Sequence, residues 1–332
     1  MIELDGSYGE GGGQILRTAV ALSAVTGKEV KIDNIRRARP KPGLSAQHVK
    51  AVESVARICE AHIEGCRMQS TRMHFAPGKI KGGNYEMDIG TAGSISLFLQ
   101  CFMPAAMHAP CAVRIKITGG TDVQWSPSID YLRYVTIGAL SRMGYDCDLR
   151  LIRRGYYPRG DGCVEAVINP SSLKKASFDT NSCNLVEGVS HSSGLPAHVA
   201  ERQAIASQKK LQENGFDARI SLEVKDYAST GSGITLWCGA VGGSALGKPG
   251  LIAEKVGDGA AGSILSELSS GAGVDIFLAD QLIPYIALAG GGSFTTRIIT
   301  PHTKTNIWVT EQFLPVKFKI EEMETGLFRV WV

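Results

Sequence analysis

The sequence predicts an α+β protein made of three repeats of a two-helix, four-stranded unit, with a smaller α/β domain inserted into the third repeat. Three observations lead to this prediction. A glycine-rich stretch beside an apolar helix, followed by a strand, occurs three times. A second helix follows each of these strands. The third occurrence comes about 100 residues later than the spacing of the first two requires.

Each predicted repeat contains a helix and the strand that follows it. The three helices cover residues 11–26, 94–108 and 279–288, and the strands after them cover residues 29–35, 112–117 and 294–299. Glycine-rich turns precede the first two helices, whereas Gly290-Gly291-Gly292 ends the third. β-branched or alternating residues favour the strands, and small residues on one side of each helix favour close packing.

A second helix is predicted after each strand, over residues 45–61, 126–143 and 305–313. In the first of these helices, Ala46, Val49, Val52 and Val55 lie at helical spacing and form one apolar face. Two further strands, at 316–320 and 327–332, close the third repeat as a hairpin. The repeating unit is therefore strand, helix, strand, helix and hairpin.

The spacing of the repeats predicts the inserted domain. About 82 residues separate Gly27 from Ala109, whereas about 181 separate Ala109 from Gly290. The excess is the size of a small domain. It fits residues 182–271, which contain a predicted helix over 198–214 and strands over 218–225 and 233–241, and leaves a three-repeat body over 1–181 and 272–332. The alternative is that the three matches are accidental, because helices and strands alternate in any α/β protein.

Composition excludes several classes of protein. The 332 residues, 44% hydrophobic and 20% charged, are typical of a globular protein. A net charge of +3 forces no large basic surface, so a contact with nucleic acid has to come from a local cluster of cations. No apolar run reaches the roughly 20 residues of a membrane span, and charged residues follow Met1 where a signal peptide would be apolar. We therefore expect a cytoplasmic protein that does not contact a membrane.

The cysteines are interpreted as thiols. Eight of them are scattered along the chain without a C-x-x-C pair. This pattern favours buried thiols over a disulfide framework or a zinc site. One or two structural disulfides remain open, because the sequence does not exclude them.

Two glycine-rich turns are candidates for binding anions. Gly9-Glu10-Gly11-Gly12-Gly13-Gln14 precedes a helix that carries Arg17, and Gly90-Thr91-Ala92-Gly93-Ser94 precedes a helix that carries Gln100. Glycine lets the backbone approach a ligand closely, and the N–H groups at a helix start favour anions. Glu10 fits a phosphate site only if a divalent cation lies between them. The alternatives are a tight turn that requires glycine and a helix that packs closely on a sheet.

A basic segment is the third candidate. Residues 36–41 contain four cations, Arg36, Arg37, Arg39 and Lys41, and Pro40 and Pro42 are expected to keep the segment extended. Arginine binds phosphate with a fixed, forked geometry. Gln47 and His48 follow at the start of the next predicted helix. The alternative is a solvated basic loop.

The fourth candidate is Pro301-His302-Thr303-Lys304-Thr305-Asn306-Ile307, directly after a predicted strand. A histidine between a strand end and a helix start lies where α/β proteins gather ligands. An ordinary core or surface histidine is the alternative, and we interpret the other six histidines in that way. G-x-S-x-G, Walker and H-E-x-x-H motifs are absent, so ATP would not be bound through a Walker loop.

These clusters, in this order, resemble the RNA 3'-terminal phosphate cyclase family. The matching segments are residues 5–17, Lys41-Pro42-Gly43-Leu44 with Gln47-His48, Gly93-Ser94, Gly119-Gly120-Thr121-Asp122, Arg154-Gly155-Tyr156-Tyr157-Pro158, Leu278-Ala279-Asp280-Gln281, and His302 with Thr305-Asn306-Ile307. The match extends from end to end. Two positions depart from the family: Asp161 stands within a run that is commonly all glycine, and Phe277 stands where relatives often have tyrosine.

The resemblance implies the three repeats and the inserted domain, and it gives each cluster a role. It implies that His302 becomes adenylylated and that Glu10 lies near a divalent metal, Mg²⁺ or Mn²⁺. The nucleotide contacts that it implies are Gln100, Phe277, Leu278, Ala279, Asp280 and Gln281. Further positions that line the active site are Gln14, Arg17, Arg36, Arg39 and Gln47.

The activity that the resemblance implies is ATP-dependent conversion of an RNA 3'-terminal phosphate into a 2',3'-cyclic phosphate, through a covalent histidine–AMP. The partner is then RNA with a 3'-terminal phosphate and not duplex DNA, because the reaction needs a 2'-hydroxyl. A homo-oligomer is left open. One alternative is a non-catalytic relative in ribosomal-RNA processing, which would lack the nucleophile. Another is an enolpyruvyl transferase, which is built from similar repeats but needs neither the histidine nor the insertion.

Overall fold

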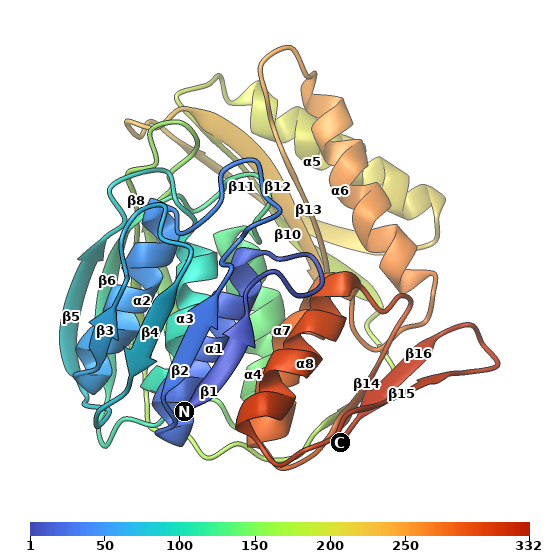
Figure 1. The fold of residues 1–332 in the computed structure, drawn as a ribbon. Coiled ribbons are helices and arrows are strands. Elements are labelled where there is room, and N and C mark those ends of the chain that lie inside the picture. The colour runs from blue at the N-terminus through green and yellow to red at the C-terminus, as the bar shows by residue number, and fades with distance from the viewer.

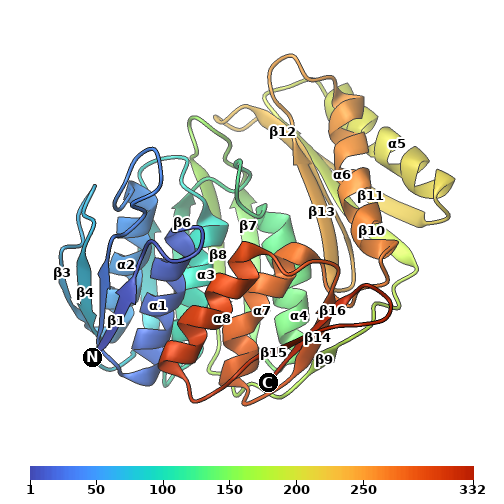
Figure 2. The same ribbon diagram turned by 45° about the vertical axis from the view of Figure 1, so that its right-hand side comes forward.

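The computed structural model describes residues 1–332 and contains eight α-helices, one π-helical segment and sixteen strands in four four-stranded sheets. The sheets mix parallel and antiparallel pairs, which confirms the predicted α+β class. Figures 1 and 2 show α1, α2, α3, α4, α7 and α8 gathered together, with three sheets around them and the fourth sheet to one side.

The first sheet is formed near the N-terminus and has the order β1-β2-β4-β3. Its strands and helices are β1 (Ile2–Asp5), α1 (Gly13–Thr26), β2 (Val30–Asp33), α2 (Ala46–Cys59), β3 (His62–Glu64) and β4 (Met73–Ala76). The first two strands are parallel, with α1 as the crossover between them, and the remaining pairs are antiparallel.

The second sheet has the order β5-β6-β8-β7. It is built from β5 (Gly83–Asp88), α3 (Ile95–Ala106), β6 (Val113–Gly119), the π-helical segment η1 (Tyr131–Thr136), α4 (Ile137–Arg142), β7 (Cys147–Arg153) and β8 (Gly162–Ile168). The second helix of this unit begins later than predicted. Ser128 determines its start, because its hydroxyl accepts a hydrogen bond of 3.1 Å from the backbone N–H of Tyr131.

The third sheet joins strands that are far apart in the chain, in the order β15-β16-β14-β9. Its elements are β9 (Ser177–Phe178), α7 (Ile276–Leu288), β14 (Ser293–Thr296), α8 (Pro301–Phe313), β15 (Lys319–Glu322) and β16 (Phe328–Trp331). In each of these three sheets the first strand in the chain pairs with the second, the second with the fourth, and the fourth with the third.

The fourth sheet lies within residues 182–271 and has the order β11-β10-β12-β13. Its elements are β10 (Leu185–Ser193), α5 (His198–Glu213), β11 (Asp217–Lys225), β12 (Gly231–Cys238), β13 (Val241–Leu246) and α6 (Ala253–Leu268). Both helices cover the face that is turned away from the rest of the molecule (Figure 2). Strand β10 and helix α6 were not predicted, because β10 is rich in serine and α6 contains several glycines.

One glycine in α6 has a packing role. A Cβ at Gly257 would lie 2.2 Å from the backbone oxygen of Gln203 in α5. The two helices therefore approach each other more closely here than a side chain would allow. Glycine in a helix interior ordinarily argues against a helix, and the tertiary contact with α5 overrides that propensity.

The buried apolar residues form two separate cores. One contains 59 residues, all but Ala240 from the body outside residues 182–271, and the other contains 11 residues, all between Val186 and Leu265. Residues 182–271 thus carry apolar packing of their own. No helix combines the length and the apolar character that crossing a membrane requires.

One disulfide joins Cys183, just before β10, to Cys238 at the end of β12. The interpretation of all eight cysteines as thiols is therefore wrong for this pair, and the alternative that was left open holds. The reason is tertiary: the two residues are 55 positions apart in sequence, yet their Cα atoms lie 5.5 Å apart. The other six cysteines are free, and burial raises the pKa of the Cys101 thiol to about 12.

Candidate active site

A cleft of about 840 Å³ lies between the helices of the body (residues 1–181 and 272–332) and the fourth-sheet region (residues 182–271). The structure brings eleven of the thirteen predicted site residues to its walls. These are Glu10, Gln14, Arg17, Arg36, Arg39, Gln47, Gln100, Phe277, Asp280, Gln281 and His302. They come from segments that are up to about 290 residues apart in the sequence.

The glycine-rich turn shapes the floor of the cleft at the start of α1. Gly12 is the N-cap residue of α1, and no side chain accepts a hydrogen bond from the first N–H groups of the helix, which face the cleft. A Cβ at Gly13 would lie 2.0 Å from Nε2 of His48, which is why no larger residue fits. Free N–H groups at a helix start form a site that favours anions.

His302 lies in the first turn of α8. The helix begins at Pro301, four residues before the predicted start, because the Thr300 hydroxyl accepts a hydrogen bond of 3.0 Å from the N–H of Thr303. Gln14 orients the imidazole: its Oε1 accepts a hydrogen bond from Nδ1, and its Nε2 donates one of 3.1 Å to the backbone oxygen of His302. Nε2 of the imidazole is therefore the nitrogen that is left to react.

Glu10 and two arginines determine the charge around His302. Nε2 of the imidazole lies 3.0 Å from Oε2 of Glu10, and Arg39 Nη2 lies 3.6 Å from the same oxygen. Burial lowers the pKa of His302, and Arg17 and Arg39 lower it further against the opposing attraction of Glu10. A lowered pKa keeps more of the imidazole neutral at neutral pH, and the neutral form has the lone pair that a nucleophile needs.

The basic segment forms turns and is not extended, so that prediction is wrong. Arg36 has a φ of 53°, and its backbone oxygen accepts a hydrogen bond of 3.0 Å from the N–H of Arg39. These turns direct Arg36 and Arg39 into the cleft, whereas Arg37 and Lys41 do not line it. The prolines at 40 and 42 lie beyond the turn and do not straighten it.

His48 is a buried structural residue on the cleft wall, as its ordinary interpretation predicted. Its Nδ1 lies 2.8 Å from the Ser45 hydroxyl at the start of α2. Burial lowers its pKa to about 3, and Arg17 and Arg36 add to that effect. A neutral His48 can therefore lie beside Arg17 and Arg36 without repelling them.

Gln47, at the start of α2, contacts the second glycine-rich turn. Its side-chain oxygen accepts a hydrogen bond of 2.9 Å from the N–H of Ser94, the residue that caps α3. Gln100 lies on α3 and is half-buried in the cleft wall. The second turn thus supports the site from behind, and only the helix that follows it reaches the cleft.

Helix α7 supplies the opposite wall. Asp275 caps it, accepting hydrogen bonds of 2.8 Å from the N–H groups of Phe277 and Leu278, so the helix begins three residues before its predicted start. The Phe277 side chain is 53% exposed and offers an aromatic face to the cleft. Leu278 and Ala279 do not line the cleft, because their side chains are fully buried in the large core.

Asp280 and Gln281 are positioned by Thr18, Asn306 and Thr136, of which the sequence analysis named only Asn306. The Thr18 hydroxyl donates to Asn306 Oδ1 at 2.8 Å, and Asn306 Nδ2 donates to the backbone oxygen of Asp280 at 2.7 Å. Thr136 donates to Gln281 Oε1 at 2.9 Å. Burial raises the pKa of Asp280 to about 7, against the opposing effect of Arg17.

The fourth-sheet region contributes cleft residues that the sequence analysis missed. Gly242, Gly243 and Ser244 of β13 and Ser263 of α6 line the cleft. Small residues of this kind carry no chemical signal in a sequence. Asn306 also lines the cleft and was not predicted as a site residue. It lies in the motif around His302, and that motif could have identified it.

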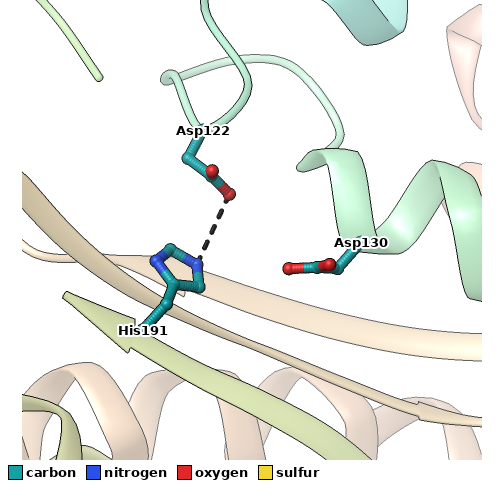
Figure 3. Close-up of side chains that lie close together, drawn as sticks. All are labelled: Asp122, Asp130 and His191. Carbon is teal, nitrogen blue, oxygen red and sulfur yellow. Dashed lines mark ion pairs between the residues drawn. The ribbon is translucent and has the colours of Figure 1, made fainter. Parts of the chain in front are cut away.

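A second group of titratable side chains lies where the body meets β10 and β11. Ligand atoms of Asp122, Asp130 and His191 lie within 4.8 Å of one another (Figure 3). Arg154 Nη1, however, lies 2.8 Å from Asp130 Oδ2 and 3.2 Å from Asp122 Oδ2, and its Nη2 lies 2.9 Å from Glu223 Oε2. Because the buried guanidinium already supplies the positive charge, we assign no metal to this group.

The cleft has the parts of a nucleotidyl-transfer site. It offers an oriented imidazole, three arginines for phosphates, an aromatic face for a base, and a carboxylate, Glu10, that is 37% exposed beside the nucleophile. Divalent cations are commonly held by one or two carboxylates together with substrate phosphates. The residues present therefore fit both a nucleoside triphosphate and a divalent cation.

Comparisons with known proteins point to one family. A family model described as RNA 3'-terminal phosphate cyclase matches residues 8–320. Proteins named RNA 3'-terminal phosphate cyclase are similar over nearly their whole length. The one from Methanococcoides burtonii is 57% identical, with 97% of each chain covered. The one from Methanosarcina mazei is 56% identical with both chains fully covered, and the one from Archaeoglobus fulgidus is 50% identical, with 97% of this chain and 98% of the relative covered.

Proposed function

Because the chain belongs to the RNA 3'-terminal phosphate cyclase family, we propose that it uses ATP to convert the 3'-terminal phosphate of RNA into a 2',3'-cyclic phosphate through a covalent adenylate on His302. The observation that carries this proposal is the geometry of His302. Its Nδ1 is bonded to Gln14, so its Nε2 faces a cleft that contains Arg17, Arg36 and Arg39.

The first step is attack of His302 Nε2 on the α-phosphorus of ATP. A P–N bond forms, the bond to the β-phosphate oxygen breaks, and pyrophosphate leaves with its electron pair. Gln14 holds the ring throughout, because the Nδ1–H that it binds becomes more acidic as positive charge develops. The arginines balance the charge on the phosphates as it shifts toward the leaving group.

Glu10 has to release the imidazole before this attack. When His302 is protonated, its Nε2 proton passes to the Glu10 carboxylate, whose Oε2 lies 3.0 Å away, because an Nε2 that bears a proton has no lone pair to donate. A divalent cation held by the Glu10 carboxylate would supply charge neutralisation for the triphosphate. Arg39, which also contacts Glu10 Oε2, is placed to stabilise the carboxylate in either state.

Two further steps complete the reaction. An oxygen of the RNA 3'-phosphate attacks the phosphorus of the adenylate, which breaks the P–N bond and returns neutral His302. The neighbouring 2'-hydroxyl then loses its proton, attacks the terminal phosphorus and releases AMP. This last step is intramolecular, so a site that orients the ribose provides much of the rate.

The test of the proposal is adenylation of the protein by ATP labelled at the α-phosphate. We expect an acid-labile, alkali-stable label on the wild type and none on His302→Asn, with cyclisation of 3'-phosphate RNA lost at least a thousandfold. The His302 side chain is partly exposed and does not belong to a hydrophobic core. The variant should therefore keep the wild-type melting temperature. Normal labelling of a folded His302→Asn protein would assign the nucleophile to another residue.

The same test separates the cyclase from both alternative functions. A non-catalytic relative in ribosomal-RNA processing would take no label, and an enolpyruvyl transferase would not either. Leu278 and Ala279 keep a nucleotide role in the proposal only through their backbone. Cytoplasmic location, the choice between Mg²⁺ and Mn²⁺, weak binding of duplex DNA and the oligomeric state stay predictions.

We also propose that the body, residues 1–181 and 272–332, consists of three repeats and that residues 182–271 are an inserted domain. The shared strand order of the first three sheets supports the repeats. The separate core of 11 residues supports the insertion. In this arrangement the active-site cleft lies where the inserted domain meets the body.

A further inference from the structure

A second hollow lies next to the active-site cleft and encloses about 470 Å³. One wall is the loop at residues 123–126, and the other is β13 with the segment that follows it. Trp125, Ser126 and Ser244 line both the hollow and the cleft, so the two spaces are continuous. Lys248 and the partly exposed Leu251 line the far wall.

Trp125 is the most exposed large apolar side chain of the molecule, at 95%. Its backbone has a φ of 59°, a left-handed conformation that a bulky residue adopts only when its surroundings impose it. The loop is anchored on both sides: the Ser126 hydroxyl donates to the backbone oxygen of Val123 at 2.9 Å, and Ser128 is bonded to Thr235 at 2.8 Å. The fold therefore holds the indole out into solvent from a fixed backbone.

We propose that this hollow binds the RNA strand on the 5' side of the terminal nucleotide, with a base stacked on Trp125 and a backbone phosphate at Lys248. The proposal rests on the proposed function, since a strand whose 3' end reaches His302 has to leave the cleft. Stacking on exposed aromatic side chains together with phosphate contacts to cations is how proteins hold single-stranded nucleic acid without reading its sequence.

The position of the hollow favours RNA over a protein partner. A protein surface could also cover an exposed indole. The hollow, however, continues directly into the space that takes the reacting end, and it is lined by an aromatic ring on one wall and a cation on the other. A strand that passes Trp125 and Lys248 would contact both sides of the cleft, the body and the fourth-sheet region.

The experiment measures cyclisation of a ten-nucleotide RNA 3'-phosphate by Trp125→Ala and Trp125→Phe. Because stacking contributes about 1–3 kcal/mol per base, we expect Trp125→Ala to raise the KM for this RNA about tenfold. Trp125→Phe should recover most of the loss, because phenylalanine keeps an aromatic face. Titration of the same RNA should quench tryptophan fluorescence in the wild type and quench it much less in Trp125→Phe.

The charge is tested with a matched pair of lysines. Lys248→Ala should reduce the slope of log affinity against log salt by about 0.7, the value for one phosphate contact on a single strand. Lys209→Ala removes a lysine from α5 whose side chain is 75% exposed and lines neither the hollow nor the cleft, and it should leave the slope unchanged. Equal slopes for the two variants would remove Lys248 from the RNA path.

Adenylation by ATP without RNA separates the two levels of the argument. If the wild type takes no label, the proposed function fails. If Trp125→Ala is labelled like the wild type and also keeps the wild-type KM for the RNA, the proposal that the hollow binds RNA is overturned, while the proposed function stands. Loss of labelling in Trp125→Phe, with a wild-type melting temperature, would likewise overturn it, because the indole would then serve ATP.

Discussion

The active-site cleft and the cluster around Arg154 both bring arginine, carboxylates and a histidine together, yet they differ in burial. In the cleft, the side chains of Arg39 and Glu10 are 40% and 37% exposed and lie 3.6 Å apart. In the cluster, Arg154 and Asp122 are 1% and 0% exposed and lie 3.2 Å apart. The arginine–carboxylate pair is thus partly exposed in the cleft and buried in the cluster.

The difference in burial indicates which charged groups are available to bind a ligand. Removing a charge from water costs several kcal/mol, so a buried ion is kept only with its partners in place. The Arg154 guanidinium contacts two body aspartates and Glu223 of β11, and it therefore ties the body to the fourth-sheet region. Arg39 and Glu10 in the cleft remain partly exposed, so a polyanionic ligand can replace their present contact.

The largest effect that we expect concerns stability and comes from the buried region. Arg154→Ala would leave Asp122 and Asp130 buried without their cation, and loss of one partner of a buried ion pair costs about 3–5 kcal/mol. We expect the free energy of unfolding to fall by that amount. Denaturant titration, followed by circular dichroism, measures it.

Arg202→Ala provides the matched control. Arg202 makes two hydrogen bonds to Glu254, of 2.6 and 2.7 Å, but its side chain is 44% exposed. Exposed ion pairs contribute about 0–1 kcal/mol, so the control should be nearly as stable as the wild type. Similar losses in the two variants would show that burial does not distinguish the regions.

The same contrast explains how far the sequence could predict the site. Residues that act on a ligand need particular chemistry, and glycine-rich turns, clustered arginines and the histidine after a strand are visible as patterns. Eight of the thirteen predicted positions belong to such patterns or to the helices beside them, and all eight line the cleft, whereas Phe277, Asp280 and Gln281, which also line it, were predicted from the resemblance alone. Leu278 and Ala279 were predicted from the resemblance, and their apolar side chains face the core.

Contacts that depend on tertiary distance could not be predicted. Nothing in the sequence places Cys183 beside Cys238, or Arg154 beside Glu223, which is 69 positions away. Helix α6 was missed because its glycines serve contact with α5, and the turns at Arg36 were missed because the following prolines suggested an extended chain. The α+β class was predicted correctly, because helical and strand periodicities are local.

The second effect concerns catalysis and comes from the cleft. We expect Arg39→Ala to reduce turnover of 3'-phosphate RNA by about 1–3 kcal/mol of transition-state stabilisation, the range of a charge-assisted hydrogen bond. Its free energy of unfolding should change by less than about 0.5 kcal/mol, since exposed pairs contribute little. Steady-state kinetics and denaturant titration on the same preparation measure both. An unchanged rate would make this segment a solvated basic loop.

The smallest effect is a pH dependence at Asp280. Its pKa is raised to about 7 by burial, so the carboxyl is mostly neutral at pH 6 and mostly negative at pH 8. A negative charge in a cleft that binds triphosphate opposes binding. We therefore expect the affinity for ATP to fall from pH 6 to pH 8 by less than tenfold relative to Asp280→Asn, which stays neutral. Isothermal titration calorimetry with ATP at both pH values measures the difference. Comparison with the variant cancels the effect of protonation of ATP itself.

Protein stability gives an independent measurement of the same group. A carboxyl with a raised pKa holds its proton in the folded state while the unfolded chain, with a pKa of about 3.9, releases it. The stability that Asp280 contributes is therefore fully present below about pH 4 and is lost as the pH rises through 7. The free energy of unfolding of the wild type should fall relative to Asp280→Asn over that interval. Parallel pH profiles for the two proteins would mean that Asp280 ionises as readily as an exposed carboxylate. Solvent would then reach the cleft at α7 more than the packing indicates.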